Sequence, residues 1–196
     1  IELTGSINYK TRQMEGSVSL LFDAHNQRIE VQIGAMKEVS VTTEKAAWVG
    51  SSATETQALS GERLGASQHD RWSCRFGDWT AQYAQVQVLK QTQLGDRSCT
   101  MVRLVPFEGS GSTVFIDNES GRLMRSDSLV QIPGLGVVGI ISQFDDYRDV
   151  EGITLPFHAR SLFATPMIGE VESTFEQAET RAKTHKGTFW PPRNLN

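Results

Sequence analysis

The stretch EGSVSLLFDAHNQRIEVQI, residues 15–33, decides the fold class because its polar and apolar residues alternate with a period of two. Val18, Leu20 and Phe22 share one face, and a second alternating run follows after a short polar turn. Such alternation is typical of β-strands with one buried face. The turn contains Asn26, which tolerates the left-handed conformation that tight hairpins need. The stretch therefore predicts an antiparallel hairpin.

The same pattern recurs along most of the chain, in short segments separated by polar turns. We count about ten or eleven strands, joined in sequence as hairpins. The exception is segment 54–70, which lacks alternation and opens with Thr54-Glu55-Thr56-Gln57, a pattern that resembles a helix capping box. Gly61 and Gly65 weaken that helix. The sequence predicts a single, mainly β domain over residues 1–196, with one or two short helices at 54–70.

An apolar face on so many strands needs a cover, which a closed barrel, a second sheet or a helical lid can supply. With only one helical segment, we favour a strongly curved antiparallel sheet, an open half-barrel, with 54–70 as a partial lid. Such a shape leaves a concave apolar pocket. The residues predicted to line this pocket and its lid are Leu20, Phe22, Ile29, Val31, Trp48, Leu59, Leu64, Trp72, Trp79 and Tyr83.

Composition and charge exclude several classes of function. The net charge of -4 with scattered Lys and Arg gives no basic stripe, so nucleic acid is not an expected partner. No apolar run reaches the ~20 residues of a membrane helix. The chain begins at Ile1 without a Met, already in a strand-like pattern, so we expect a mature fragment from which a signal sequence was removed, and the missing signal does not argue for the cytoplasm.

Motifs for catalysis are weak. Residues 134–139, GLGVVG, match the dinucleotide fingerprint, but strand-like sequence follows and 153–160 holds no acidic residue for a ribose. His69 and Asp70 form an acid–base pair without a nucleophile motif. We predict no enzyme, no cofactor and no metal site.

Cys74 and Cys99 leave two states open, a disulfide or two buried thiols. Cys99 alternates with Met101 in a strand-like run, which favours a core thiol. Neither cysteine has a Cys or His at metal-ligand spacing, so a zinc site is not expected.

The segment 132–141 is too apolar for an ordinary exposed turn; its apolar residues include Ile132, Leu135, Val137 and Val138. Two readings stay open for this hairpin tip. It packs in the core, or it forms a contact surface over the pocket mouth, against a membrane or lipid, or on a partner protein. The second reading gives an alternative function, an interaction or scaffold module of a larger envelope protein.

Two runs carry a family resemblance: TVFIDNESGRL at 113–123 and FDDYRDVEGITLP at 144–156. A strand ending in Asp, a turn ending in Gly-x-Leu and a hairpin through Asp-Tyr-Arg-x-Val-x-Gly-Ile-x-Leu-Pro together resemble the bacterial outer-membrane lipoprotein-sorting proteins of the LolA/LolB/LppX-like fold. The resemblance spans nearly the whole chain, and its motifs are structural turns.

The resemblance implies an open, incomplete β-barrel whose cavity holds lipid acyl chains beneath helices, without a cofactor. It also implies that the protein functions in the periplasm or at the cell envelope. The implied partner is a lipid or a lipidated protein, and a membrane or an envelope protein is a further possible contact. Related domains also occur attached to other envelope proteins, so the chain fits one piece of a longer protein. We therefore predict a non-enzymatic domain that binds apolar ligands and resembles a lipid or lipoprotein carrier.

Overall fold

The computed structural model describes residues 1–77, 79, 82–132, 135–180, 182, 184–185, 187–192 and 195, leaving the side chains at 131, 132 and 136 outside the description. These residues form thirteen strands, a short 3₁₀ turn at Lys10–Arg12 and two helices. The strands are β1 (Glu2–Tyr9), β2 (Met14–Phe22), β3 (Gln27–Ile33), β4 (Met36–Thr42), β5 (Ala47–Ser51), β6 (Thr54–Ala58), β7 (Gln85–Leu94), β8 (Arg97–Val105), β9 (Ser112–Asp117), β10 (Leu123–Ile132), β11 (Gly136–Val150), β12 (Ile153–Phe163) and β13 (Glu170–Glu179). The helices are α1 (Glu62–His69) and α2 (Trp72–Arg75).

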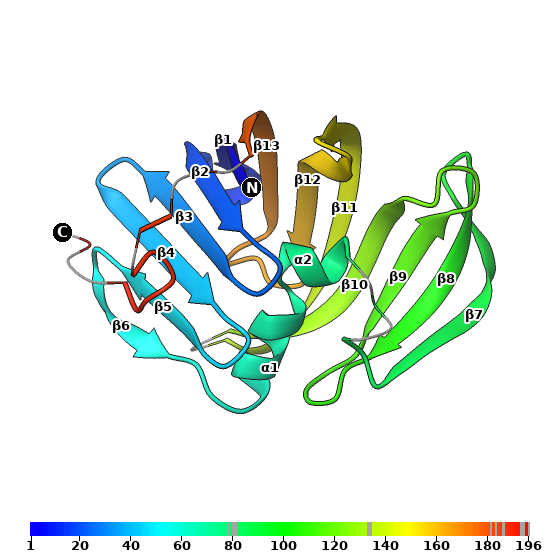
Figure 1. The fold of residues 1–196 in the computed structure, drawn as a ribbon, viewed down its shortest axis with the longest axis horizontal. Coiled ribbons are helices and arrows are strands. Elements are labelled where there is room, and N and C mark those ends of the chain that lie inside the picture. Colours follow the sequence, from blue (N-terminus) through cyan, green and yellow to red (C-terminus); the bar gives the residue numbers. More distant parts are fainter. Residues whose placement is uncertain are drawn as a thin grey trace.

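All thirteen strands belong to one sheet in the order β6-β5-β4-β3-β2-β1-β13-β12-β11-β10-β9-β8-β7. Most neighbours are hairpins, while β1 pairs with β13 near the middle of the sheet. The two edge strands, β6 and β7, are consecutive in sequence, and the segment between them carries both helices across the concave side (Figure 1). The prediction of a curved, open antiparallel sheet with a short helical lid is confirmed. The strand number is thirteen rather than ten or eleven.

One of the additional strands corrects the expected extent of the lid. Residues 54–58 form edge strand β6, paired with β5, and the helix expected to open at Thr54 begins only at Glu62. Thr54 and Thr56 are β-branched, which suits an extended chain. Their hydroxyls bond to Ser51 Oγ and to the Pro192 carbonyl oxygen, at 2.9 and 2.8 Å. Pairing with β5 therefore overrides the capping pattern.

The first hairpin has the predicted register, with Val18 opposite Val31 and Leu20 opposite Ile29. Its apolar face belongs to a core cluster on the concave side: Leu3, Ile7, Val18, Leu20, Phe22, Val150, Leu155, Phe157 and Phe175. A second cluster lies under the other half of the sheet: Tyr83, Val102, Leu104, Val114, Leu123 and Phe144. Phe76, directly after α2, packs against both clusters. The helical segment therefore connects the two clusters.

The outer face of β3 to β6 is covered by the C-terminal segment. Arg28 Nη1 donates to the Thr188 carbonyl oxygen at 3.2 Å, and Leu195 lies against Gly50. Val39 and Val41 are fully buried here, on the face opposite to the helices. Covering one edge of the sheet in this way protects unpaired strand groups from other chains.

The outer face of β11 to β13 carries a network of charged groups around His158. Its Nδ1 lies 2.8 Å from Asp145 Oδ1 and its Nε2 lies 2.8 Å from Glu172 Oε1. Glu172 also pairs with Lys10 at 2.5 Å. Burial opposes a charge on His158, but its hydrogen bonds to Glu172 and Asp145 outweigh that effect and raise its pKa. Protonated His158 thus holds three neighbouring strands together.

Replacing His158 by Gln tests this network through the pH dependence of stability. Because the pKa of His158 is raised in the folded chain, its contribution is complete below the unfolded value of about 6.5 and is lost as pH rises through the folded pKa. Urea unfolding at pH 5.5 and 8.5 should therefore show a larger stability difference between wild type and His158→Gln at pH 5.5. A difference that is constant or grows with pH contradicts the assignment.

Candidate functional site

Helix α1, on the concave face, begins after one glycine and packs at another. Gly61 precedes α1 with φ +55°, a left-handed conformation that glycine adopts without strain. Gly65 lies so close to the chain opposite that an added Cβ would be 3.3 Å from the Glu108 carbonyl oxygen. The two glycines that weaken α1 in isolation therefore suit the backbone at its start and its close packing against Glu108.

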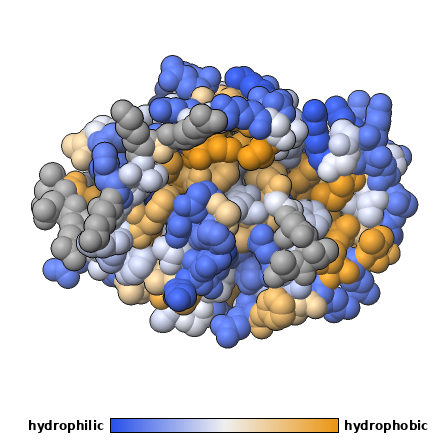
Figure 2. All heavy atoms as spheres, in the orientation of Figure 1, coloured by the Kyte–Doolittle hydropathy of each residue, from blue (hydrophilic) through white to orange (hydrophobic). Residues whose placement is uncertain are grey.

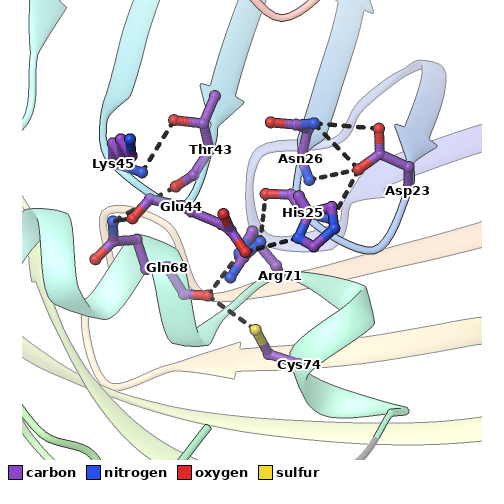
Figure 3. Close-up of polar contacts among 9 residues, drawn as sticks. All are labelled: Asp23, His25, Asn26, Thr43, Glu44, Lys45, Gln68, Arg71 and Cys74. Carbon is purple, nitrogen blue, oxygen red and sulfur yellow. Dashed lines mark hydrogen bonds and ion pairs between the residues drawn. The ribbon is translucent and has the colours of Figure 1, made fainter. Parts of the chain in front are cut away.

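Polar contacts fasten the helices to the first half of the sheet, which consists of β1 to β6 (Figure 3). The buried Arg71 guanidinium donates to the carbonyl oxygens of His25 and Gln68. Gln68 Nε2 in turn donates to the Glu44 carbonyl oxygen at 2.6 Å. His25 and Glu44 lie in the β2–β3 and β4–β5 turns, so Arg71 and Gln68 connect the lid to both hairpins.

Two further contacts strengthen this attachment, and a third joins the two helices to each other. The Trp72 backbone N–H donates to Gln27 Oε1 at 2.8 Å, and the hydroxyls of Thr42 and Ser67 are 2.6 Å apart. Cys74 Sγ donates to the Gln68 carbonyl oxygen at 3.2 Å. Cys74 and Cys99 are both buried free thiols, which settles the alternative that the sequence left open. Burial raises the pKa of the Cys74 thiol.

Aromatic contacts seat α2 on both halves of the sheet. The Trp72 ring meets Phe175 edge-on at 5.5 Å between centroids, and it lies 6.0 Å from Phe22. Phe76 lies 5.0 Å from Trp72 and meets Phe144 edge-on at 5.4 Å. Such pairs are each worth about 0.5–1.5 kcal/mol beyond the area they bury. Trp72 therefore packs against β2 and β13, and Phe76 extends this packing to β11.

The contacts of the lid with the second half of the sheet are mostly between planar groups. His69 stacks on Tyr83 at 5.3 Å, and Arg75, which pairs with Asp70, lies 5.7 Å from the Phe144 ring centroid. Burial raises the pKa of Tyr83 to about 12 and lowers the pKa of His69. The lid is thus held by directional hydrogen bonds on one side and by apolar and stacking contacts on the other.

Two open clefts flank α2, and Figure 2 shows apolar side chains gathered in the central hollow. The large cleft, about 610 Å³, is lined on its apolar side by Phe76, Trp79, Val86, Ile116, Leu123 and Tyr147. The small cleft, about 430 Å³, is lined by Phe22, Trp72, Phe76, Ile153 and Leu155. Phe76 and Gly77 line both clefts and divide them. A third cleft, about 280 Å³, lies beside α1.

Five of the ten residues predicted for the pocket line these clefts. Phe22 and Trp72 line the small cleft, and Trp79 lines the large one. Ile29 and Leu59 line the cleft beside α1. Leu20, Val31 and Tyr83 belong to or pack against the core clusters rather than these clefts, and Leu64 is a half-buried residue of α1.

Trp48 does not reach the concave side. It pairs with Val41, whose neighbours Ser40 and Thr42 line the cleft beside α1. Because successive strand residues point to opposite faces, Val41 and Trp48 point outward. The prediction of Trp48 as a pocket residue is therefore wrong.

The apolar hairpin tip is divided between the two faces of the sheet. Val138 is buried at 5% exposure, whereas Val137 is 63% exposed and Leu129 is 49% exposed. Leu129 pairs with Gly139, so Leu129 and Val137 share the outer face. Leu135 is half-buried, and the side chain of Ile132 lies outside the described residues.

Sequence reasoning missed the residues that form most of the large cleft. Val86, Ile116, Leu123 and Tyr147 line this cleft but were not assigned to the site. Leu123 and Tyr147 belong to the two motif runs at 113–123 and 144–156. The apolar and aromatic residues next to the turns of these runs were the signal that could have identified them. These two runs, which we interpreted only as structural turns, thus also form part of the wall of the large cleft.

The two members of the predicted acid–base pair, His69 and Asp70, line a further cleft together with Ser112 and Ser126. There Asp70 pairs with Arg75, and His69 stacks on Tyr83. Among the described residues, no group of three His, Cys, Asp or Glu side chains is placed to hold a metal ion. In the same part of the chain, neither helix is long and apolar enough to cross a membrane.

Comparison with solved structures identifies the fold. A domain from Vibrio parahaemolyticus assigned to outer membrane lipoprotein sorting superposes with a TM-score of 0.61 at 8% identity, covering 96% of this chain and 88% of that one. A LolA superfamily protein from Nitrosomonas europaea gives 0.64 at 11% identity, covering 93% and 86%.

A DUF1329 family protein from Desulfovibrio piger gives a TM-score of 0.58 at 12% identity, covering 96% of this chain and 87% of that one. No family model and no curated protein matches the sequence. The chain therefore has the LolA-like fold, and the resemblance predicted from the two motif runs is confirmed at the level of fold.

Replacing Arg71 by Met tests the polar attachment of the lid. The change leaves the His25 and Gln68 carbonyl oxygens without this donor and should destabilise the fold by about 1–3 kcal/mol. Amide hydrogen exchange should accelerate in residues 62–76 before the rest of the sheet. Arg63→Met, at an arginine of α1 in the same lid, is the matched control and should exchange like wild type. Uniform acceleration over the whole sheet contradicts a local attachment.

Proposed function

We propose that this chain is a non-enzymatic binding domain for the apolar chains of a lipid or a lipidated protein, working outside the cytoplasm at the bacterial cell envelope. The observation that carries the proposal is the pair of open apolar clefts beneath a small helical lid. Similarity of fold to lipoprotein-sorting domains supports the class of ligand and the location.

The physical basis of binding would be burial of hydrocarbon. Each methylene removed from water contributes about 0.8 kcal/mol, so a fatty chain binds without a large set of polar contacts. The aromatic walls offer broad, rigid surfaces for such a chain. Phe76 divides the clefts, which gives room for two alkyl chains on its two sides.

A second candidate function is docking of an envelope protein on the hairpin tip. The exposed outer-face residues Val137 and Leu129 favour it, because adjacent exposed apolar residues mark contact surfaces. This surface lies on the face opposite to the clefts, so the two functions are separable.

Filling a cleft tests the binding proposal. Val86→Trp in the large cleft and Ile153→Trp in the small cleft change side chains that are 42% and 47% exposed, so the fold should tolerate both. Each should weaken binding of the uncharged probe N-phenyl-1-naphthylamine about tenfold, the equivalent of losing about two buried methylenes. Probe fluorescence titration measures the change.

The matched control is Leu162→Trp, which is 50% exposed and lines neither cleft. It should bind the probe like wild type. Equal weakening by all three variants, or no probe binding by wild-type protein freed of lipid, contradicts binding in the clefts.

Val137→Asp tests the docking candidate. A charge on the exposed tip should abolish assembly with a partner chain while leaving probe binding unchanged, because Val137 lies on the outer face. Sedimentation velocity of cell extracts containing the tagged protein measures assembly. Unchanged sedimentation eliminates docking through this surface.

A further inference from the structure

The turn between β9 and β10 is held in one shape by Asp117. Its carboxylate accepts hydrogen bonds from the Ser120 backbone N–H at 3.0 Å and from the Ser120 hydroxyl, and its own N–H donates to the Arg122 carbonyl oxygen at 2.9 Å. Gly121 completes the turn at φ +70°. The hydrogen bonds from Ser120 keep the pKa of Asp117 below its usual range. The backbone of Arg122 is therefore fixed beside the large cleft.

The side chain of Arg122 is also positioned. Its guanidinium carbon lies 5.3 Å from the centre of the Tyr147 ring, within the range of a cation–π contact. The Tyr147 hydroxyl donates to the Leu123 carbonyl oxygen, which fixes the ring. Arg122 and Tyr147 come from the two motif runs, so the runs that carry the family resemblance meet at this point of the cleft.

The charges around the large cleft have one sign. Its described lining residues include the guanidinium groups of Arg75 and Arg122 and no carboxylate. Arg75 is already paired with Asp70, which leaves Arg122 as the cation placed toward a ligand. By contrast, the described lining of the small cleft includes Asp23 and no Lys or Arg. The two clefts thus differ in charge while sharing the apolar divider Phe76.

We propose that the large cleft selects amphiphiles with an anionic head group, a carboxylate or a phosphate, whose head lies against Arg122 and whose alkyl chain lies along Trp79, Ile116 and Leu123. This inference rests on the proposed function, because it names the class of ligand for the same site. Arginine suits the role, since its planar guanidinium donates two parallel hydrogen bonds to either kind of head group. An apolar wall beside the pair strengthens it by lowering the local dielectric constant.

The test compares two amphiphiles with the same alkyl chain, laurate and 1-dodecanol, at pH 8, where laurate is ionised. Quenching of tryptophan fluorescence measures the affinity of wild type, Arg122→Gln and the control Arg160→Gln, whose arginine pairs with Glu170 on the outer face. Arg122→Gln should weaken laurate about tenfold and leave dodecanol unchanged, as expected for loss of one charge-assisted contact. Arg160→Gln should change neither affinity, and dodecyl phosphate should behave like laurate.

Salt dependence in wild-type protein gives a second measurement that needs no variant. Raising ionic strength should weaken laurate and leave dodecanol unchanged or tighter. Equal affinities of wild type for laurate and dodecanol, or an equal loss of both in a folded Arg122→Gln, would overturn the inference while the proposed function stands. Failure of wild type to bind either ligand would overturn both. Binding of inorganic phosphate as tight as dodecyl phosphate would show an anion site without a lipid and would overturn the inference.

Discussion

Residues 59–84 connect the two opposite edges of one sheet, and this connection carries both helices across its concave face. Twelve inter-strand spacings of about 4.8 Å would separate the edges of a flat sheet by roughly 58 Å. The connection contains two short helices, which advance only about 1.5 Å per residue. A sheet that curls until its edges face each other lets this segment cross directly. The helices therefore lie over the concave face, as Figure 1 shows.

The small size of the lid explains why the concave face stays open. Two helices of eight and four residues cannot cover the apolar faces of thirteen strands, so clefts remain on both sides of α2. Arg71 and Gln68 attach the lid to one half of the sheet through backbone carbonyl groups. Phe76 bridges to the other half by packing alone.

Strict alternation made the first hairpin predictable, including the inward direction of Leu20, Phe22, Ile29 and Val31. It failed at Trp48 because Ala47, Trp48 and Val49 are all apolar, and pattern alone cannot choose the inward face when both faces are covered. The strand at 54–58 was missed because its pairing with β5, and its contact with the distant Pro192, outweigh local preference. Arg122 was missed because its role depends on Tyr147, which lies far away in sequence. Contacts between residues far apart in the sequence thus determine these features, and hydrophobic periodicity alone cannot predict them.

The central claim is that apolar chains bind inside the curve of the sheet, on both sides of Phe76. Isotope-filtered NOE spectroscopy with labelled protein and an unlabelled lauryl chain tests it most directly, since an NOE requires close contact between ligand and side-chain protons. The account predicts NOEs from the chain methylenes to Phe76, Trp79 and Ile116 and to no residue of the outer face. NOEs to Val137 or Leu162, without any to Phe76, would contradict it.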